Sequence, residues 1–215
     1  MTDTKITALT ELATITATDY MVVVDDTGGS PVTKFVQAET VRDFVNPQTR
    51  YISIPIKAFH PTTTAGCAAL ATLEMGTNKQ AIEYMAFDKA TDENAEISFP
   101  MPPNWNGGAI YCTAYWLHPA TTTNFGVVWG FKSRSYADGD ALDQAFGTAV
   151  LVTDTGGTTS DCYISPETAA ITPAGSPAGG QKIDLVVYRD ANHATDDTLA
   201  VDAYLTDVLV RYTVS

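Results

Sequence analysis

Two Asp-Thr-Gly triplets, beginning at Asp26 and Asp154, come closest to a catalytic motif in this chain. Aspartic proteases use a pair of such triplets to hold two carboxylates side by side, sharing one proton. Here a second glycine follows each triplet, where those enzymes carry Ser, Thr or Ala. Glycine allows positive φ and aspartate accepts local backbone hydrogen bonds. We therefore predict that both Asp-Thr-Gly-Gly segments form tight turns and not a catalytic pair.

Histidines are the first candidate metal ligands. The chain has three, His60, His118 and His193, and they lack a short spacing such as His-x-x-x-His. A zinc site needs its ligands to converge on one point. His60 and His118 each precede a proline at the end of an expected strand. The sequence therefore predicts loop histidines and no metal bound by them.

Acidic residues gather at 138–143, at Asp92-Glu93 and along 190–202. The first group resembles the start of an EF-hand loop, but it lacks the central glycine, and Ala149 stands where the bidentate glutamate belongs. Two interpretations remain: a looser Ca²⁺ or Mg²⁺ site between loops, and a solvated acidic rim. We expect the rim, and we predict no metal and no cofactor.

Cysteines and tryptophans complete the candidate residues. The three cysteines (Cys67, Cys112 and Cys162) are odd in number and not in metal spacing, so we expect reduced, mostly buried thiols. The three tryptophans (Trp105, Trp116 and Trp129) and the ten tyrosines could form a sugar-binding platform, but aromatics on alternating strand positions favour a core or an interface. No nucleophile elbow, P-loop or dinucleotide-binding glycine pattern occurs. We predict no catalytic residue.

The composition limits the partners. The chain has 215 residues and a formal net charge of −13, without a Lys/Arg cluster. Nucleic acids and anionic membrane surfaces are themselves negatively charged, so neither is an expected partner. The N-terminus lacks the apolar core of a signal peptide, and no apolar run approaches the ~20 residues of a membrane span. We expect a protein made in a cytoplasm.

Two aromatic-rich runs, Gly108–His118 and Phe125–Phe131, dominate the chain and flank a Pro/Thr/Asn segment. This pattern predicts a β-hairpin. In the first run Ile110, Cys112, Ala114 and Trp116 share one face by the period of two, yet the opposite face is also largely apolar. Such a strand lies in the middle of a sandwich or carries a subunit contact on its outer side.

Further strands are expected on both sides of this pair. They lie at 51–59, 81–88, 95–101, 148–153, 162–164 with a continuation near 169–172, 182–189 and 201–214. Cys67–Met75 is compatible with a helix or a strand. This spacing predicts an all-β domain over residues 51–215, an antiparallel β-sandwich of the jelly-roll type.

The last of these strands is apolar enough to be internal to a sheet. Tyr204, Val208, Val210, Tyr212 and Val214 share one face by the period of two. The register breaks at Thr206-Asp207, because Asp207 lies on the face of Leu205 and Leu209. We expect that truncating this strand unfolds the domain.

Residues 1–46 have a different character. Ile6, Leu9 and Leu12 are spaced as anchors; strands are expected at 19–25 and 32–36 around a turn at 26–31, and a helix over 37–45. A hairpin with one short helix is too small to bury a core of its own. We predict that residues 1–46 are an anchor that leans on another protein.

Several blocks resemble a module of tailed-bacteriophage virion proteins. They include the segment from Phe87 to Gly108, Tyr115-Trp116, the Val127–Gly130 segment, residues 138–143 and residues 196–202. The resemblance extends from about Ala65 to Thr213 and favours a strand at 69–75. Residues 6–12, the 19–24 strand and the hairpin separately resemble the attachment segments of phage fibre proteins, although Thr10 stands where those often have proline.

The resemblance implies a non-enzymatic structural protein, because the family offers no catalytic residues to carry over. It also implies a homotrimer, which would explain a strand that is apolar on both faces. Our first hypothesis is a capsid-attached head fibre or decoration protein of a virion, docked through residues 1–46. The second is a tail fibre that binds a host surface glycan. The third is a hydrolase that uses carboxylates from the acidic loops.

Overall fold

The computed structural model describes residues 18, 20–25, 32–38, 41, 48–120 and 125–214. The chain divides into two compact units, Met1–Gln48 and Thr49–Ser215. Among the described residues, no helix is long and apolar enough to cross a membrane.

The first unit contains a β-hairpin. Strands β1 (Tyr20–Asp25) and β2 (Val32–Gln37) pair antiparallel, with Val22 opposite Phe35. Both predicted strands are thereby confirmed. The turn at 26–31 and the spaced residues Ile6, Leu9 and Leu12 lie outside the described residues, as does most of the expected helix at 37–45.

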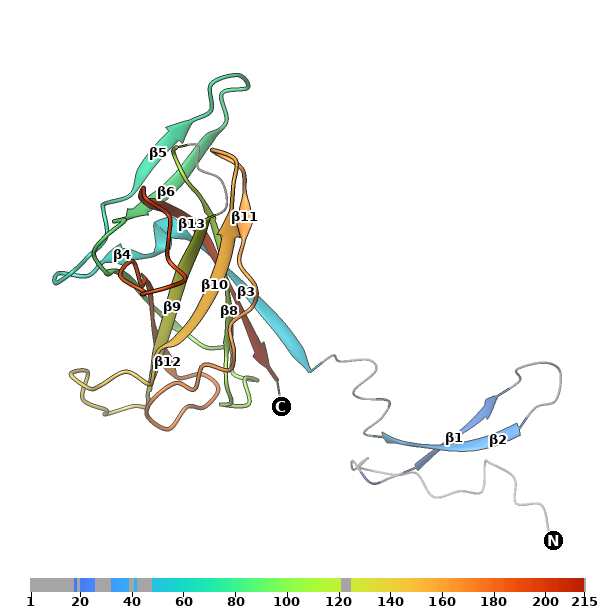
Figure 1. Ribbon diagram of the computed structural model, residues 1–215. Helices are drawn as coiled ribbons and strands as arrows, with labels where there is room; N and C mark the ends of the chain where they lie inside the picture. The colour runs from blue at the N-terminus through green and yellow to red at the C-terminus, as the bar shows by residue number, and fades with distance from the viewer. Residues whose placement is uncertain are drawn as a thin grey trace, which may run out of the picture. The chain divides into compact units, whose positions relative to one another are not determined.

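The second unit is a β-sandwich of two antiparallel sheets, as the sequence predicted (Figure 1). One sheet has the order β10-β9-β12-β7-β4, made of Val150–Gly156, Phe125–Tyr136, Lys182–Arg189, Glu93–Pro100 and His60–Pro61. The other has the order β11-β8-β13-β6-β5, made of Tyr163–Ile164, Tyr111–Leu117, Ala203–Thr213, Ala81–Phe87 and Ala71–Glu74. Strand β3 (Thr49–Pro55) also pairs with β13, and a short 3₁₀ helix, η2 (Ile56–Ala58), follows it.

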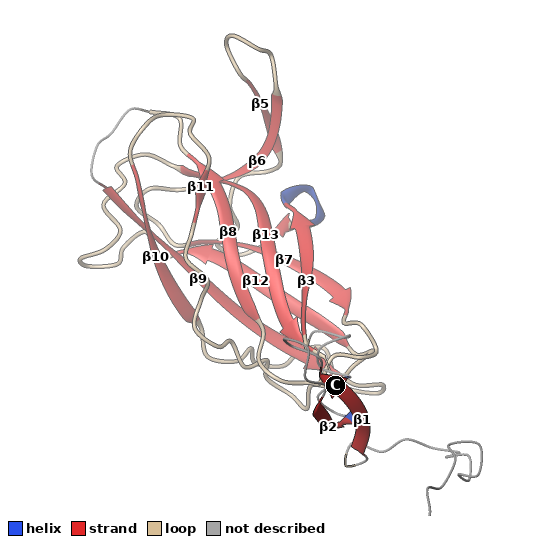
Figure 2. Cartoon of the chain, turned by 90° about the vertical axis from the view of Figure 1, so that its right-hand side faces the viewer, coloured by secondary structure: helices blue, strands red, loops and turns tan. Residues whose placement is uncertain are grey.

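The chain alternates between these sheets. From β3 to β4, from β6 through β7 and β8 to β9, and from β10 through β11 and β12 to β13, each connection crosses from one sheet to the other. Only β5–β6 and β9–β10 join neighbours in one sheet within this unit. Alternation of this kind is the jelly-roll arrangement. Strands β5 and β6 also extend beyond the sandwich as an arm, together with their connecting residues 75–80 (Figure 2).

Aromatic side chains from both sheets fill the core. Trp116 of β8, Trp129 and Phe131 of β9, and Phe87 of β6 have no exposed surface. The Phe87 and Trp129 rings meet edge to face at 5.2 Å, an arrangement aromatic pairs prefer. Trp105 is also buried. The prediction that the tryptophans belong to the core is confirmed.

The hairpin predicted from the two aromatic runs is wrong. Strand β8 pairs with β11 and β13 in one sheet, whereas β9 pairs with β10 and β12 in the other. Both strands exist, but they belong to different sheets. The same sequence pattern, two strands separated by turn residues, occurs in a hairpin and in a connection between two sheets. The local pattern therefore did not distinguish these two arrangements. Of the two alternatives for the first run, a strand in the middle of the sandwich is confirmed, since β8 lies between β11 and β13; a subunit contact on its outer face stays a prediction.

Strand β9 is also longer than predicted and continues to Tyr136. In the added part Ser133 and Ser135 are buried while Lys132 and Arg134 are partly exposed, so the period of two persists with small polar residues inside. On the outer face of the same strand the Tyr188 ring lies over Gly130. A Cβ at Gly130 would be 2.2 Å from that ring, so a larger residue would require the Tyr188 ring to move.

Strand β13 is internal to its sheet, as predicted, and its register shifts between Leu205 and Asp207. This β-bulge confirms the predicted break. It also corrects one assignment, because Tyr204 is not on the inward face with Val208 and Val210. The extra residue at the bulge places Leu205 inward and Tyr204 outward, where Tyr204 stacks on Tyr84 at 4.1 Å. The ambiguous stretch at 67–75 contains strand β5.

Candidate functional site

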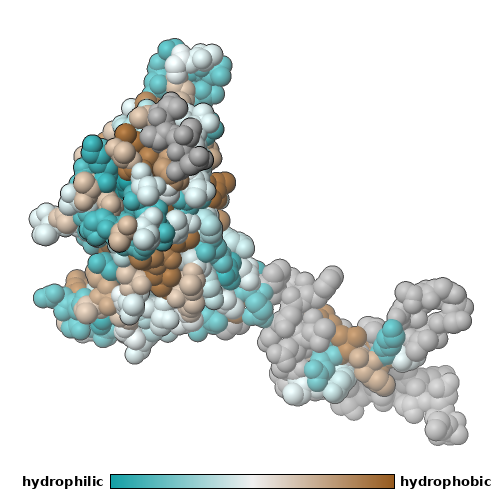
Figure 3. Space-filling model, in the orientation of Figure 1, coloured by the Kyte–Doolittle hydropathy of each residue, from teal (hydrophilic) through white to brown (hydrophobic). Residues whose placement is uncertain are grey.

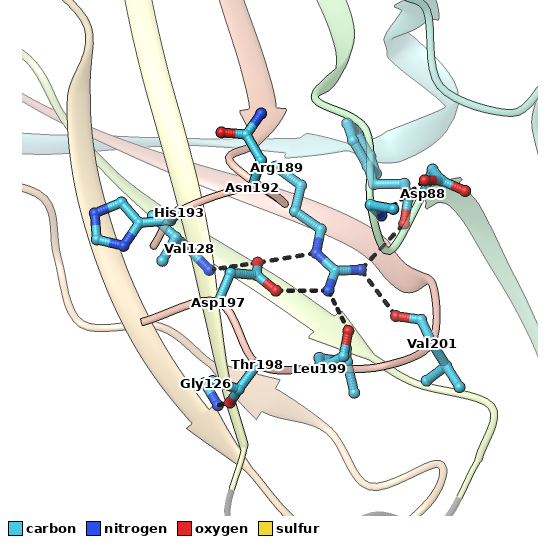
Figure 4. Close-up of polar contacts among 12 residues, drawn as sticks. Asp88, Gly126, Val128, Arg189, Asn192, His193, Asp197, Thr198, Leu199 and Val201 are labelled. Atoms are coloured by element: carbon cyan, nitrogen blue, oxygen red, sulfur yellow. Dashed lines mark hydrogen bonds and ion pairs between the residues drawn. The ribbon is translucent and has the colours of Figure 1, made fainter. Parts of the chain in front are cut away.

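The most highly connected polar group of the sandwich is Arg189, at the end of β12 (Figure 4). Its Nε and Nη2 donate to the two carboxylate oxygens of Asp197 at 3.0 and 2.7 Å. Nη2 also donates to the Leu199 carbonyl at 2.7 Å. Nη1 donates to the carbonyls of Val201 at 2.8 Å and Phe87 at 3.4 Å. All five N–H groups of the guanidinium thus have acceptors.

This cluster holds a loop in place and leaves no room for a substrate. The side chains of Arg189 and Asp197 are 0% and 1% exposed. Asp197 also accepts the backbone N–H of Val128 at 3.1 Å, and the Asp190 N–H bonds the Val128 carbonyl at 2.9 Å. These two hydrogen bonds hold the loop after β12 against the backbone of β9 at Val128. A buried pair with every donor satisfied is a structural element, not a reactive one.

The second Asp-Thr-Gly triplet is not a turn, contrary to prediction. Asp154, Thr155 and Gly156 end strand β10. Asp154 accepts the indole N–H of Trp116 at 2.8 Å and so links the two sheets. A Cβ on Gly156 would lie 2.4 Å from the Phe125 ring, which explains the glycine without any catalysis. Asp26 lies outside the described residues.

The three histidines do not gather. His60 belongs to β4, not to a loop, and its Nε2 lies 3.1 Å from Glu96. His193 accepts the Asp196 N–H in the loop after β12 at 3.3 Å. His118 follows β8 and is fully buried, 4.8 Å from the Phe125 ring centroid. Its ring nitrogens have no hydrogen-bond partner among the described residues.

The acidic groups make separate contacts with neighbouring side chains and backbone groups. Within the described part of the chain, no three His, Cys, Asp or Glu side chains come together as a metal ligand set. Asp92 accepts the Asn192 amide at 2.9 Å, and the backbone N–H of Ala90 lowers the pKa of Asp88. Burial, followed by the nearby Asp92, raises the pKa of Asp190. The predicted solvated rim is wrong for Asp197, which is the buried partner of Arg189.

The cysteines are free, as expected, with Cys67 and Cys112 buried and Cys162 exposed. Burial raises the pKa of the Cys67 thiol to about 12 and also raises that of Cys112. Only Cys162 is therefore open to modification, since thiolates are the reactive form.

A cavity of about 370 Å³ opens where β3 and β6 separate along one edge of β13, and we call it the fork cavity. Strand β6 pairs with β13 over 203–205 and β3 pairs with it over 207–213, so the two strands part at Thr206. There β3 ends at Pro55, β6 continues into the arm, and the β13 bulge lies between them. The other wall comes from the end of β8 and from residues near Ser160 and Cys162.

The fork cavity combines apolar walls with a few polar groups. Met75 and Ile82 of the arm and Leu117 of β8 provide aliphatic surface. Glu83 and Asp207 provide carboxylates, and Ser160 and Thr206 provide hydroxyls. Lys57 pairs with Glu83 at 3.0 Å. Among the residues that form this cavity, the sequence singled out Trp116, Cys162 and the break at Thr206-Asp207. It did not indicate that they meet, because the cavity forms only when the arm leaves the sheet.

A more open recess of about 480 Å³ lies beside Gly126 and is lined chiefly by threonines and Asp196. Phe125 supplies its aromatic carbon, but that side chain is only 4% exposed. Ligand sites are mostly apolar with a small number of placed polar groups. The fork cavity fits that description better.

The β1–β2 hairpin presents apolar side chains to the surface (Figure 3). Val22 and Phe35 lie opposite each other and are 62% and 69% exposed, and Tyr20 is 63% exposed. Large apolar side chains that neighbour one another at a surface mark sites of protein contact more often than single exposed residues do.

A second partly apolar surface is the outer face of β3, β8 and β13. Arg211 lies between Tyr51 and Tyr111 in the strand register. Its guanidinium lies 3.7 Å from the Tyr111 ring centroid and pairs with both carboxylate oxygens of Glu167 at 2.6 Å. Tyr51 of β3 is more than half exposed on this surface, as is Ile164 of the neighbouring strand β11.

Comparisons with known proteins identify related architectures and no family. No family model matches the chain, and no curated protein matches it. A xylan-binding CBM22 domain of Paenibacillus barcinonensis Xyn10C covers 76% of this chain and 99% of its own, at 12% identity and a TM-score of 0.42. A carbohydrate-binding module, CBM28, specific for non-crystalline cellulose covers 72% and 84%, at 10% identity and a TM-score of 0.40. The infectious bursal disease virus VP2 protein covers 91% and 38%, at 9% identity and a TM-score of 0.35. At such scores no ligand or assembly is transferred to this chain.

Proposed function

We propose that this chain is a non-enzymatic structural protein of a bacteriophage virion, a head fibre or decoration protein that attaches through residues 1–46 and displays the sandwich. The observation that carries the proposal is the exposed apolar face of the β1–β2 hairpin. Two strands alone are marginally stable in water, so a hairpin that exposes Val22 and Phe35 gains stability by covering them with a partner. The partner is a protein surface of the particle, because the acidic chain does not favour nucleic acid.

Labelling of particles tests this proposal. Antibody to the sandwich, viewed by electron microscopy on particles of the phage that encodes the chain, is expected to label the capsid. Labelling of the tail favours the second candidate below. Particles that carry no label overturn the virion role.

Hairpin variants test the attachment surface. The double variant Val22→Ser/Phe35→Ser removes the apolar face and is expected to abolish binding to particles that lack the protein. Leu142→Ser is the matched control, because Leu142 is 66% exposed in a loop of the sandwich and belongs to no proposed contact. Equal binding by the double variant and the control would show that attachment does not use this face.

We further propose that the protein is a homotrimer whose copies meet at the outer face of β3, β8 and β13. Tyr51, which is exposed, and Tyr111 and Tyr115, which are partly exposed, support this arrangement, because strand faces covered by another copy are more apolar than faces in water. Light scattering is expected to give three times the chain mass of 23.0 kDa. A monomer mass, or a trimer undisturbed by Tyr51→Lys, would contradict it.

A second candidate function is recognition of a host surface glycan by a tail fibre. The specific observation in its favour is the fork cavity, which joins aliphatic walls to carboxylates and hydroxyls. A glycan array probed with the whole protein is expected to show binding. An array without any bound glycan counts against this candidate and leaves the attachment role untouched.

A further inference from the structure

We propose that the fork cavity is a saccharide-binding site that takes a single sugar unit of a glycan, with Asp207, Glu83 and Thr206 as the groups that bind its hydroxyls. This inference rests on the second candidate function and gives it a location. It does not depend on attachment through the hairpin.

The size and walls of the cavity suit a small polar ligand with a carbon face. Its volume of about 370 Å³ lies near the lower end of ligand sites, which span roughly 300–1,000 Å³. Met75 and Ile82 are partly exposed there, so they offer aliphatic surface for the C–H groups of a ring. Trp116 lies beneath but is fully buried, so the arm supplies the contact surface and no aromatic platform is involved.

The polar groups suit hydroxyls better than a charged ligand. A sugar hydroxyl both donates and accepts, so it needs acceptors and donors within one site. The carboxylates of Asp207 and Glu83 are acceptors, and the Thr206 hydroxyl is left as an acceptor because it already donates to the Tyr115 carbonyl at 3.1 Å. Donors come from the Ser160 hydroxyl on the facing wall and from the Lys57 ammonium, which pairs with the cavity residue Glu83 at 3.0 Å. Because Lys57 already neutralises Glu83, the site has less negative charge than a cation would need. The two carboxylates equally disfavour an anion.

The backbone at the cavity departs from regular geometry at two independent points. The β-bulge of β13 turns Thr206 and Asp207 toward the fork, and bulges often re-aim side chains at sites. Ser160, on the opposite wall, has a φ of +62°, which is costly for a residue other than glycine. The bulge and the positive φ of Ser160 each cost stability. Their presence on facing walls of one cavity supports a binding role for that cavity, because such strain is found most often at functional sites.

The experiment is saturation-transfer NMR of the whole protein with D-glucose, D-galactose and N-acetyl-D-glucosamine, each at about 10 mM, which detects millimolar dissociation constants. At least one sugar is expected to receive saturation. Ala81→Phe, which fills the cavity from the exposed arm, is expected to abolish the signal. Ala141→Phe makes the same change in an exposed loop outside the cavity and is expected to retain it. Asp207→Asn is expected to weaken binding about tenfold, since a carboxylate acceptor becomes an amide.

Cys162 gives a readout that needs no mutation. It lines the cavity and is the exposed cysteine, whereas Cys67 and Cys112 are buried. Iodoacetamide is expected to alkylate Cys162 more slowly when the bound sugar is present, and the alkylated protein should lose the sugar signal. Saturation transfer that persists in Ala81→Phe or after alkylation overturns the fork cavity as the site while leaving glycan recognition standing. The absence of saturation for all three sugars overturns the fork cavity as a site for one sugar unit, and an array without any bound glycan then overturns glycan recognition as well.

Discussion

The sandwich and the hairpin use the same kinds of side chain in opposite ways. In the sandwich Trp116, Trp129 and Phe131 are completely buried between two sheets. In the hairpin Val22 and Phe35 face each other across two strands and remain more than 60% exposed. Two packed sheets provide two apolar faces that cover each other, whereas a single hairpin has nothing within itself to cover its own.

This difference suggests that the sandwich provides the stability of the chain and that the hairpin provides its contact with a partner. A unit of this size with a buried aromatic core is expected to fold without the hairpin. On our proposal, the hairpin gains stability from the surface that covers Val22 and Phe35. Changes in the sandwich should therefore alter unfolding, and changes in the hairpin should alter binding.

The largest effect is expected from removing residues 206–215. This deletion takes away most of β13, which pairs with β8 on one side and with β3 on the other. Loss of an internal strand leaves both neighbours without hydrogen-bond partners, so no cooperative unfolding transition should remain. Far-UV circular dichroism during thermal unfolding measures this. A cooperative transition in the truncated chain would show that the sandwich does not depend on β13.

Arg189→Met is expected to be the next largest change, at about 3–5 kcal/mol of unfolding free energy, because Asp197 is left buried without its counterion. Denaturant titration measures the loss. The matched control is Arg211→Met, since the Arg211–Glu167 pair is partly exposed and should cost less than about 1 kcal/mol. Equal losses of unfolding free energy in the two variants would mean that burial does not determine how much each ion pair contributes to stability.

Asp190→Asn is expected to raise the unfolding free energy slightly, whereas the two preceding changes lower it. Burial raises the pKa of Asp190 above its ordinary value, so ionisation at neutral pH opposes folding. The variant should be more stable than the native chain at pH 7, by less than about 1 kcal/mol. This advantage should shrink as pH falls through the raised pKa and vanish below the ordinary value near about 3.9, where both states are protonated. A stability difference that is constant with pH would contradict this assignment.

Most strands and the sandwich class were predictable because alternation is a local property of the chain. Strand β12 shows what alternation along a strand predicts and what it leaves open. Its inward positions Ile183, Leu185 and Val187 follow the period of two, and Arg189 continues the same face. A cation on an inward face indicates a buried counterion. The local sequence does not identify Asp197 as that counterion, because the pairing depends on the conformation of the loop after β12.

The pairing of strands and the fork cavity could not be predicted for a related reason. The segment between β8 and β9 could return or cross, and only packing of the two sheets decides this. The fork cavity needs β3 and β6 to share an edge of β13, although more than twenty residues separate them in the chain. The break at Thr206-Asp207 and the strands at 51–59 and 81–88 were visible in the sequence, but the sequence did not show that these strands meet at the break.

The most direct test of the account compares the unfolding free energy of residues 49–215 with that of the whole chain, under the same denaturant titration. The account predicts that the two agree within about 0.5 kcal/mol, the range expected for changes away from a core, and that only the whole chain binds particles. A shorter chain that loses several kcal/mol, or that still binds particles, would contradict the division of folding and attachment between the two units.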